Sequence, residues 1–297
     1  MGRKTLLNLK ACPLLTASLE SWLIEFKNDL PSVAKGSIRL RVNPQSIKGV
    51  WLDFSNQDIK RLLEEGDWLE RLQAKAIVEI GQKRKRLIRK EDRWALGDPV
   101  LFPWSETYFF EQSLPLFTSI GGFTQSGPQA TQVLSEVFLK LLPEEVPSWL
   151  ELGSGSGTFT LPLLSAGKRV NAVEMDAQAL KGLLQGAAHS GISALLSTHL
   201  LDFNGKKDTL RRLFEENRGV IVDPPRSGLG NLVSFLTELI PSQRPDYFYY
   251  VSCWEDSFVS DVHGLNELGY LGTRLFGVDQ FPQSPLFEIL ALFQKQY

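Results

Sequence analysis

Two residues with reactive side chains stand at or inside apolar stretches of the chain. Cys253 directly follows the apolar run 247–252, and Glu288 lies inside the apolar run 286–293. A buried cysteine is usually a small hydrophobe, but at the carboxyl end of a central strand beside a crevice its thiolate can be a nucleophile. A lone carboxylate among apolar residues is costly unless it has a task. Glu288 is therefore a candidate general base with a raised pKa.

Two further polar side chains stand where loops are expected. Asp223 ends the apolar run 219–222, and the two prolines behind it remove backbone donors and fix the loop. Asp223 and Arg226 are thereby held toward the crevice, where a carboxylate can pair with the imide N–H of a uracil or the amine of another base. Gln125 lies in a glycine-flanked loop, and its amide could read a base edge or a cofactor. The alternative for Gln125 is an ordinary solvated loop glutamine.

A glycine-rich turn follows the apolar run Trp149–Leu152 and precedes a stretch that can form a helix. It contains Gly153, Gly155 and Gly157, and glycine is needed where the backbone turns sharply and approaches a ligand. The spacing is not that of dinucleotide-binding turns, and Glu151 just before the turn would repel a pyrophosphate. An adenosine ligand without phosphates, such as S-adenosylmethionine, fits both features. The alternative is an ordinary glycine turn in an α/β sheet.

Two acidic residues end the next apolar strands. Glu174 closes the run 169–174, where a carboxylate in this type of sheet pairs with the ribose hydroxyls of an adenosine ligand. Asp202 follows the run 195–200 and could accept the adenine amino group, or it could cap the chain before Phe203-Asn204. These signals predict a Rossmann-like α/β sheet over residues 121–297.

The first hundred residues predict a smaller α+β domain, from strands at 37–42, 49–54 and 74–80 and a helix at 56–65. The stretch 81–90 is the most basic of the chain. It is either a solvated hairpin or loop, or an edge that contacts RNA phosphates through Lys83, Arg84, Lys85 and Arg86. The aromatic residues of 101–120 predict an interdomain connector, with core packing favoured over base stacking.

The composition excludes several classes of protein. With 297 residues, 43% hydrophobic and 22% charged, the chain can build a full core. A net charge of −2 means that nucleic acid must bind through a local patch. Two distant cysteines argue against a disulfide framework and cannot supply a four-thiolate metal or iron–sulfur site. Polar residues interrupt the amino-terminal apolar stretch, and no apolar run nears 18 residues. We therefore expect a cytoplasmic protein without a signal peptide, which acts as a monomer and binds no membrane.

Several motifs occur together in an order that resembles the S-adenosylmethionine-dependent RNA uracil-C5 methyltransferases, which make 5-methyluridine in transfer and ribosomal RNA. The resemblance covers roughly residues 115–297 and implies a class I methyltransferase fold. It implies that Cys253 is the nucleophile and Glu288 the proton-abstracting base, that Asp223 and Gln125 contact substrate or cofactor, and that Asp261 is the acid after the nucleophile. The motifs are Phe123–Gln125, Glu151–Pro162, Asp223–Arg226, Tyr250–Cys253 and Phe281-Pro282 with Glu288.

Some residues depart from the family pattern. Trp254-Glu255 stands where the family has Asn-Pro, Leu286 stands where it has a histidine, and Gly127 stands where it has an asparagine. We expect neither the family's N-terminal RNA-binding barrel nor its iron–sulfur cluster. These departures leave the RNA target open.

The predicted function is methylation of C5 of a uridine in tRNA or rRNA, through a covalent adduct between Cys253 and C6 of the base. The uridine would be single-stranded or flipped out of its stack. One alternative is a methyltransferase acting on another base or an exocyclic nitrogen. The other is a catalytically silent RNA-binding relative.

Overall fold

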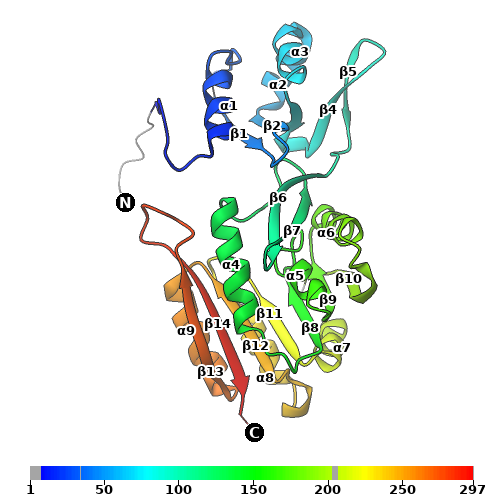
Figure 1. The fold of residues 1–297 in the computed structure, drawn as a ribbon. Coiled ribbons are helices and arrows are strands. Elements are labelled where there is room, and N and C mark those ends of the chain that lie inside the picture. Colours follow the sequence, from blue (N-terminus) through cyan, green and yellow to red (C-terminus); the bar gives the residue numbers. More distant parts are fainter. Residues whose placement is uncertain (1–7, 34, 203–206, 297) are drawn as a thin grey trace. The chain divides into compact units, whose positions relative to one another are not determined.

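The computed structural model describes residues 8–33, 35–202 and 207–296. The chain divides into two compact units (Figure 1). The first contains the residues up to Trp104 together with Ser119–Gly122, and the second contains Ser105–Thr118 together with the residues from Phe123 onward.

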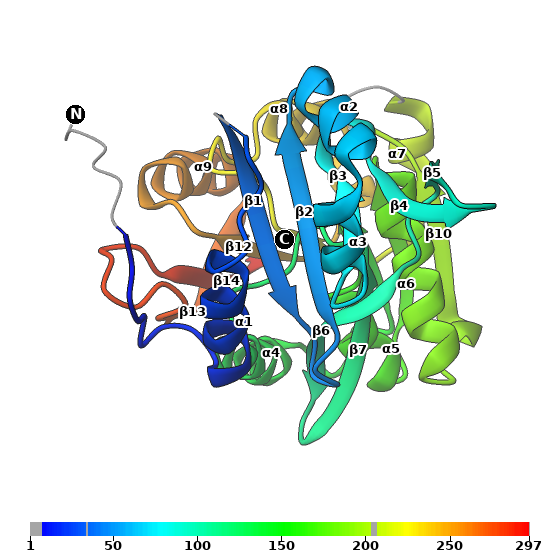
Figure 2. The same cartoon turned by 90° about the horizontal axis from the view of Figure 1, so that it is seen from above.

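The first unit is a five-stranded sheet with helices packed on one face. The sheet order is β1-β2-β3-β4-β5, and only the β2–β3 pair is parallel. Val50, Leu52, Val78, Ile80 and Leu87 form one buried core with apolar residues of the helices, which Figure 2 shows beside these strands. The elements are α1 (Ala17–Lys27), β1 (Gly36–Val42), β2 (Lys48–Phe54), α2 (Asn56–Glu65), α3 (Asp67–Gln73), β3 (Ile77–Ile80), β4 (Lys85–Lys90) and β5 (Arg93–Gly97).

The other face of this sheet carries a row of polar and aromatic neighbours. Arg39, Trp51, Glu79 and Arg86 are successive cross-strand partners on β1, β2, β3 and β4. The Glu79 carboxylate is buried and accepts the backbone N–H groups of Ile120 and Gly121. Burial raises the pKa of Glu79, and the two backbone N–H donors oppose that rise. These bonds explain why the segment 119–122 belongs to the first unit.

The second unit is a seven-stranded sheet in the order β10-β9-β8-β11-β12-β14-β13. The first five of these are parallel, whereas β14 runs antiparallel between β12 and β13. The strands are β8 (Ser148–Leu152), β9 (Arg169–Glu174), β10 (Leu196–Leu200), β11 (Gly219–Val222), β12 (Tyr247–Ser252), β13 (Tyr270–Val278) and β14 (Glu288–Lys295).

Helices cover both faces of this sheet, because alternate residues of each buried strand point to opposite faces. Leu150 and Leu152 share a core with one set of helices, and Trp149 between them shares a second core with the other set. The first set is α7 (Lys207–Glu216), α8 (Asn231–Glu238) and α9 (Glu255–Glu267); the second is α4 (Pro128–Leu141), α5 (Thr160–Ser165) and α6 (Ala177–His189). The predicted α/β class with a Rossmann-like sheet and a smaller α+β unit is confirmed.

Some local predictions differ from the structure. The third strand of the first unit begins at Ile77 rather than at residue 74, because Ala74 and Ala76 still bond to the last turn of α3. Part of the basic stretch forms the strand β4. The segment expected to be a connector contains the hairpin β6 (Phe102–Phe109) and β7 (Gln112–Thr118). Its aromatic residues have no strict alternation, so the strand signal is weak.

The described residues show neither a membrane-spanning helix nor a metal-binding cluster. Among the helices of these residues, none combines the length and apolar character that crossing a bilayer requires. Within the same ranges, no group of three or more His, Cys, Asp or Glu side chains is placed to hold a metal ion. The expected absence of a metal and the expected monomer stay predictions.

Candidate active site

The parallel strands of the second unit end at one edge of the sheet, and the candidate residues follow these ends. Gly153 follows β8, Glu174 ends β9, Asp223 follows β11 and Cys253 follows β12. Neighbouring strands are in register here, with Leu152 beside Val222 and Val222 beside Tyr250. Ligands in open α/β sheets bind outside the carboxyl ends of the strands. The topology therefore gathers the candidate residues at one crevice.

Glu288 joins this group from the antiparallel strand. β12 pairs with β14 so that Ser252 lies opposite Ile289. Continuing the register by one residue places Cys253 opposite Glu288, and opposite residues of antiparallel strands have neighbouring Cβ atoms. The charge of Glu288 accordingly helps to raise the pKa of the Cys253 thiol. Two residues far apart in sequence are thus brought together by strand pairing.

The thiol of Cys253 is partly buried and has one cationic partner. Burial is the main cause that raises its pKa, followed by the charge of Glu288. The side chain of Arg226 opposes this rise through a hydrogen bond to the thiol. The guanidinium carbon of Arg226 also lies 5.2 Å from the centre of the Trp254 ring, a cation–π distance. Arg226 is therefore positioned to stabilise a thiolate.

The two carboxyl groups near the thiol are both hard to ionise. Glu288 is 3% exposed, and burial, with the charge of Asp223 as the second cause, raises its pKa to about 8. Burial raises the pKa of Asp223 to about 7. The raised pKa of Glu288 agrees with the expectation for a lone carboxyl in an apolar strand. A carboxyl with a pKa near neutrality is suited to proton transfer.

Gln125 faces Asp223 in a small buried network. The Gln125 amide Nε2 lies 3.5 Å from Asp223 Oδ2, at the limit of a hydrogen bond. On its other side, Gln280 Nε2 donates to Gln125 Oε1 at 2.5 Å. Gln280, in the loop between β13 and β14, was missed in the sequence. A single buried amide in a loop has no periodic signal, and only its contact with a candidate residue reveals it.

The glycine turn after β8 adopts the conformation that its sequence predicts. Gly153, Gly155 and Gly157 have φ angles of 78°, 56° and 104°. A Cβ on Gly157 would lie 2.6 Å from a methyl carbon of Leu183, so this position must be glycine for packing on α6. A Cβ on Gly155 would enter open space, with no atom within 4 Å among the described residues. Gly155 therefore borders a space that a ligand can occupy.

Glu174 binds the same turn. Its Oε2 accepts the backbone N–H of Gly155 at 2.9 Å, and its Oε1 accepts those of Met175 and Asp176 at 2.7 and 2.8 Å. Each carboxylate oxygen has two lone pairs, so acceptor capacity remains. The predicted contact with a ribose stays a prediction.

Glu151 and Asp202 lie in different surroundings. Glu151 is buried, accepts Thr160 Oγ1–H at 2.5 Å, and has a pKa raised to about 8 mainly by burial. Asp202 is exposed after β10. The alternative role of Asp202 as a cap before Phe203-Asn204 falls on residues 203–206, outside the described residues.

Asp261 on α9 ties together the elements that hold Asp223 and Cys253. Its Oδ2 accepts the backbone N–H of Leu229 at 2.8 Å and the hydroxyl of Tyr250 at 2.6 Å. Leu229 follows the Asp-Pro-Pro-Arg loop, and Tyr250 lies on β12. Burial and the bond to Asp261 raise the pKa of Tyr250.

The four basic candidates belong to the first unit, whereas the residues above belong to the second. Lys83 ends the short 3-10 turn Gly81–Lys83, and Arg84 has a left-handed backbone with φ 49°. Lys85 forms an ion pair with Asp98. Arg86 lies opposite Glu79, and its Nε is buried without a hydrogen-bond partner among the described residues.

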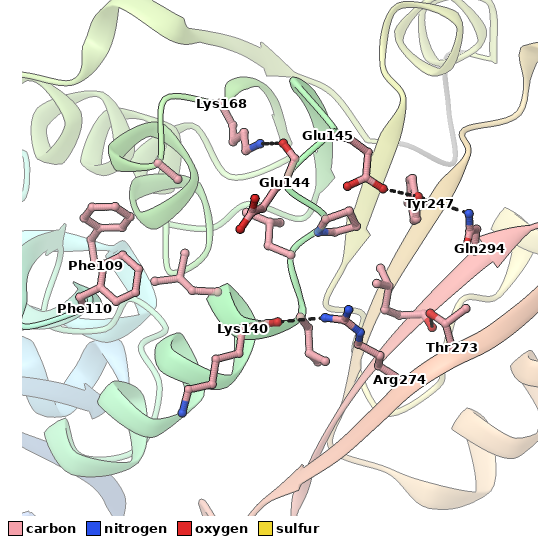
Figure 3. A pocket seen from close by; sticks show the side chains of 16 residues that line it. Phe109, Phe110, Lys140, Glu144, Glu145, Lys168, Tyr247, Thr273, Arg274 and Gln294 are labelled. Carbon is pink, nitrogen blue, oxygen red and sulfur yellow. Dashed lines mark hydrogen bonds between the residues drawn. The ribbon is translucent and has the colours of Figure 1, made fainter.

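Two hollows of the second unit differ in chemistry. The one beside Cys253 has a volume of about 190 Å³ and is lined by Cys253, Trp254, Glu255, Asp256, Pro285, Leu286, Phe287 and Ile289. The larger one, of about 750 Å³, lies at the opposite end of β12, near Tyr247 and Arg274 (Figure 3).

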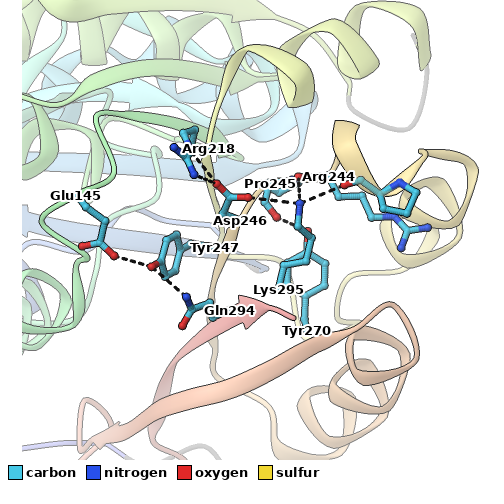
Figure 4. Close-up of polar contacts among 10 residues, drawn as sticks. Glu145, Arg218, Arg244, Pro245, Asp246, Tyr247, Tyr270, Gln294 and Lys295 are labelled. Carbon is cyan, nitrogen blue, oxygen red and sulfur yellow. Dashed lines mark hydrogen bonds and ion pairs between the residues drawn. The ribbon is translucent and has the colours of Figure 1, made fainter. Parts of the chain in front are cut away.

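Of the described residues that line the larger hollow, none is a candidate from the sequence. Several of its polar side chains are paired. Tyr247 donates to Glu145 and accepts from Gln294, and the adjacent Asp246 pairs with Arg218 and Lys295 (Figure 4). These bonds give the amino end of β12 a structural role.

Comparisons with known proteins identify the family. The chain is 34% identical over 300 residues to a protein of Bdellovibrio bacteriovorus described as an uncharacterized RNA methyltransferase, over 99% of this chain and 76% of that protein. It is 29% identical over 189 residues to the 23S rRNA (uracil(747)-C(5))-methyltransferase RlmC of Pectobacterium atrosepticum. It is 28% identical over 165 residues to the 23S rRNA (uracil(1939)-C(5))-methyltransferase RlmD of Methylococcus capsulatus.

The chain belongs to the RNA uracil-C5 methyltransferase family. It is an RNA methyltransferase by this membership. The matches to RlmC and RlmD cover 61% and 55% of this chain but only 46% and 36% of those proteins, so the chain spans less than half of their length. No protein-family model matches the chain.

A solved structure shares the fold of this family member. The structure is that of Pyrococcus abyssi tRNA (uracil-54, C5)-methyltransferase in complex with S-adenosyl-L-homocysteine. It has a TM-score of 0.66 and 19% identity, and the match covers 97% of this chain and 70% of that one. At this identity the likeness shows the fold.

Two departures from the family pattern meet in one place. Trp254 and Leu286 both line the hollow beside Cys253. Each replaces a polar residue of the pattern by an apolar one, whereas Glu255, which lines the same hollow, replaces a proline by a charged residue. The third departure, Gly127, precedes α4 with φ 78°, a conformation that favours glycine.

Proposed function

We propose that this protein transfers a methyl group from S-adenosylmethionine to C5 of a uridine in tRNA or rRNA, with Cys253 as covalent nucleophile and Glu288 as base. The observation that carries the proposal is the β12–β14 register, in which Ser252 lies opposite Ile289, so that the next residues, Cys253 and Glu288, come together at the carboxyl end of β12. The named activities of RlmC and RlmD support uridine as the substrate.

S-adenosylmethionine fits the residues at the carboxyl ends of β8 and β9. The space in front of Gly155 would be filled by a Cβ, which matches the close approach of a ligand to the backbone. Glu174 at the end of β9 would bind the ribose, and Asp202 after β10 would face the adenine. Bound there, the cofactor would supply an electrophilic methyl group.

The chain's own groups would do the remaining chemistry. C5 of uracil is a poor nucleophile, and addition of the Cys253 thiolate to C6 makes it an enolate carbon that can be methylated. Arg226 stabilises the thiolate before attack. Glu288 then removes the proton from C5, and elimination releases Cys253. Asp223 would orient the ring by accepting its N3–H.

The first unit would contact the RNA through Lys83, Arg84, Lys85 and Arg86. The whole chain has a net charge of −2, so attraction to phosphates must come from a local cluster such as this one. We propose residues 1–100 as this RNA-contacting domain and 121–297 as the methyltransferase domain.

Cys253→Ala tests the covalent route. Methyl transfer to unmodified tRNA and 23S rRNA transcripts should vanish, because the C6 adduct cannot form, while calorimetric binding of S-adenosylmethionine persists. RNA containing 5-fluorouridine should trap the wild-type protein on Cys253, since fluorine cannot leave as a proton does. Methyl transfer by the alanine variant would exclude the covalent route and favour methylation at an exocyclic nitrogen or another base.

A further inference from the structure

The strongest unassigned feature of the second unit is the buried amide of Gln280. Its side chain is 2% exposed, and its Oε1 has no hydrogen-bond partner among the described residues. An unsatisfied buried acceptor is costly. Its Nε2 is used, because it donates to Gln125 Oε1 at 2.5 Å. The hydrogen bond observed for the Gln280 side chain is thus made to Gln125, which faces the crevice.

The orientation of the Gln125 amide follows from its two neighbours. Above pH 7 the Asp223 carboxyl is ionised and only accepts hydrogen bonds, so the end of the Gln125 amide that faces it is then the NH2 group. The carbonyl of Gln125 must then face Gln280 and needs a donor there. Gln280 supplies that donor, which makes the reversed amide orientation unfavourable.

This orientation presents a donor and an acceptor side by side. The 3.5 Å between Gln125 Nε2 and Asp223 Oδ2 is long for a direct hydrogen bond, so both groups remain available to a ligand. If C6 of the base is held at Cys253, the N3 position lies across the ring from it. A uracil then offers N3–H to Asp223 and its O4 acceptor to the NH2 group of Gln125. A cytosine in the same place offers an acceptor at N3 and a donor at N4, and both mismatch.

We propose that Gln280 is a positioning residue that fixes the Gln125 amide with its NH2 group toward Asp223 and thereby selects uridine over cytidine. The inference rests on the proposed function, since it requires a pyrimidine held at Cys253. Gln280 touches Gln125 and acts on the base only through it.

The test compares two RNAs with one protein preparation. Transcripts of tRNA and 23S rRNA made with 5-fluorouridine, or with 5-fluorocytidine, are incubated with S-adenosylmethionine, and single-turnover rates of the covalent adduct on Cys253 are measured. The ratio of the two rates is internal to each preparation, so a partly unfolded variant does not change it. The wild type should favour the uridine analogue.

Two variants of Gln280 change its bonding and little of its shape. Gln280→Met removes the donor and should lower the ratio about tenfold, roughly the value of one hydrogen bond. Gln280→Glu replaces the donor by an acceptor, favours the reversed amide and should lower the ratio further. Gln129→Met, at an exposed glutamine at the start of α4, is the matched control and should leave the ratio unchanged.

A double-mutant cycle separates positioning from a general structural role. In a Gln125→Met background, Gln280→Met should have no further effect on the ratio, because there is no amide left to orient. An unchanged ratio in Gln280→Met alone, or an equal loss in the Gln125→Met background, would overturn the inference while leaving the proposed function intact. A wild type that forms no adduct with either RNA would overturn the proposed function, and the inference with it.

Discussion

At the scale of single residues, the crevice gathers groups that resist ionisation. Cys253, Glu288 and Asp223 all have raised pKa values, each chiefly because of burial, and the charge of one carboxylate raises the pKa of its neighbours. Titratable groups with such shifts in a crevice are typical of catalytic sites. Burial of these three titratable side chains in the crevice lowers the stability of the folded protein.

Glu288→Gln should reveal this cost in the pH dependence of stability. The pKa of Glu288 is about 8 in the folded state and close to the ordinary glutamate value of 4.5 in the unfolded state. The folded protein therefore holds a proton that the unfolded chain releases, and stability falls as pH rises from 4.5 to 8. The glutamine variant lacks this loss. Its free energy of unfolding relative to that of the wild type should therefore rise across that range, by roughly 1–3 kcal/mol.

Urea unfolding at several pH values measures this difference, with Glu267→Gln at an exposed position of α9 as the control. A difference between Glu288→Gln and wild type that stays constant from pH 5 to pH 8 would contradict the raised pKa.

Arg226→Gln should raise the pKa of Cys253 further, because it removes the hydrogen bond that opposes the rise. Alkylation by iodoacetamide requires the thiolate, so it should become severalfold slower below the titration of the thiol and recover at high pH. The rates are measured in a Cys12→Ser background, because Cys12 is also a partly exposed free thiol. Arg212→Gln, an exposed change on α7, should alkylate like the parent. Identical pH profiles of alkylation for Arg226→Gln and the parent would mean that Arg226 does not stabilise the Cys253 thiolate.

At the scale of elements, two local devices build the crevice. The glycine turn joins β8 to α5 with three residues of positive φ, and the Glu174 carboxylate accepts the N–H of the middle one. On the other side, the antiparallel β14 enters next to β12 and brings Glu288 to the end of a parallel strand. The glycine turn leaves space for a ligand, and β14 supplies the candidate base.

Gly155→Ala should separate ligand binding from folding. The added Cβ meets no described atom within 4 Å but enters the space proposed for S-adenosylmethionine. The calorimetric affinity should fall about tenfold or more, whereas the free energy of unfolding should fall only by the strain of a positive φ, about 1 kcal/mol.

Gly167→Ala is the matched control. Gly167 also has a positive φ, of 73°, with no described atom within 4 Å of an added Cβ, and it lies after α5 away from the turn. It should show similar destabilisation and unchanged affinity. Equal affinity losses in both variants would mean that the turn does not border the cofactor.

At the scale of the whole molecule, chemistry and charge are divided between two units. The candidate reactive residues belong to the unit with the seven-stranded sheet, and the basic stretch belongs to the unit with the five-stranded sheet. With 32 basic and 34 acidic residues, the chain as a whole does not attract RNA. Affinity should therefore depend on a few local cations.

Lys83→Gln with Arg84→Gln should weaken RNA binding by a salt-dependent amount. Each lost phosphate contact lowers the slope of log affinity against log salt by roughly 0.7–0.9, so two contacts should lower it by about 1.5. Filter binding of tRNA and 23S rRNA transcripts over a potassium chloride series measures the slope. Lys181→Gln with Arg212→Gln, two exposed cations of the second unit, is the charge-matched control. A slope unchanged by the first pair would place the RNA contact elsewhere.

Local features of this protein could be predicted from its amino-acid sequence. The glycine spacing at 153–157 predicted the turn, and apolar runs predicted the buried strands of the larger sheet, because backbone conformation and burial are written in short-range patterns. Cys253 and Glu288 stood out for the same reason, as polar side chains beside or within apolar runs. Strands whose sequences have no regular alternation, such as β6 and β7, were not predicted.

Which of these features come together depends on the three-dimensional fold. β14 lies between β12 and β13, so the pairing that sets Cys253 opposite Glu288 depends on strand order and register, which no local period encodes. The bond from Gln280 to Gln125 joins residues 155 positions apart. Such contacts form only when the packed sheet brings distant loops together, because their free energy comes from burial of the assembled crevice and not from the propensity of either segment.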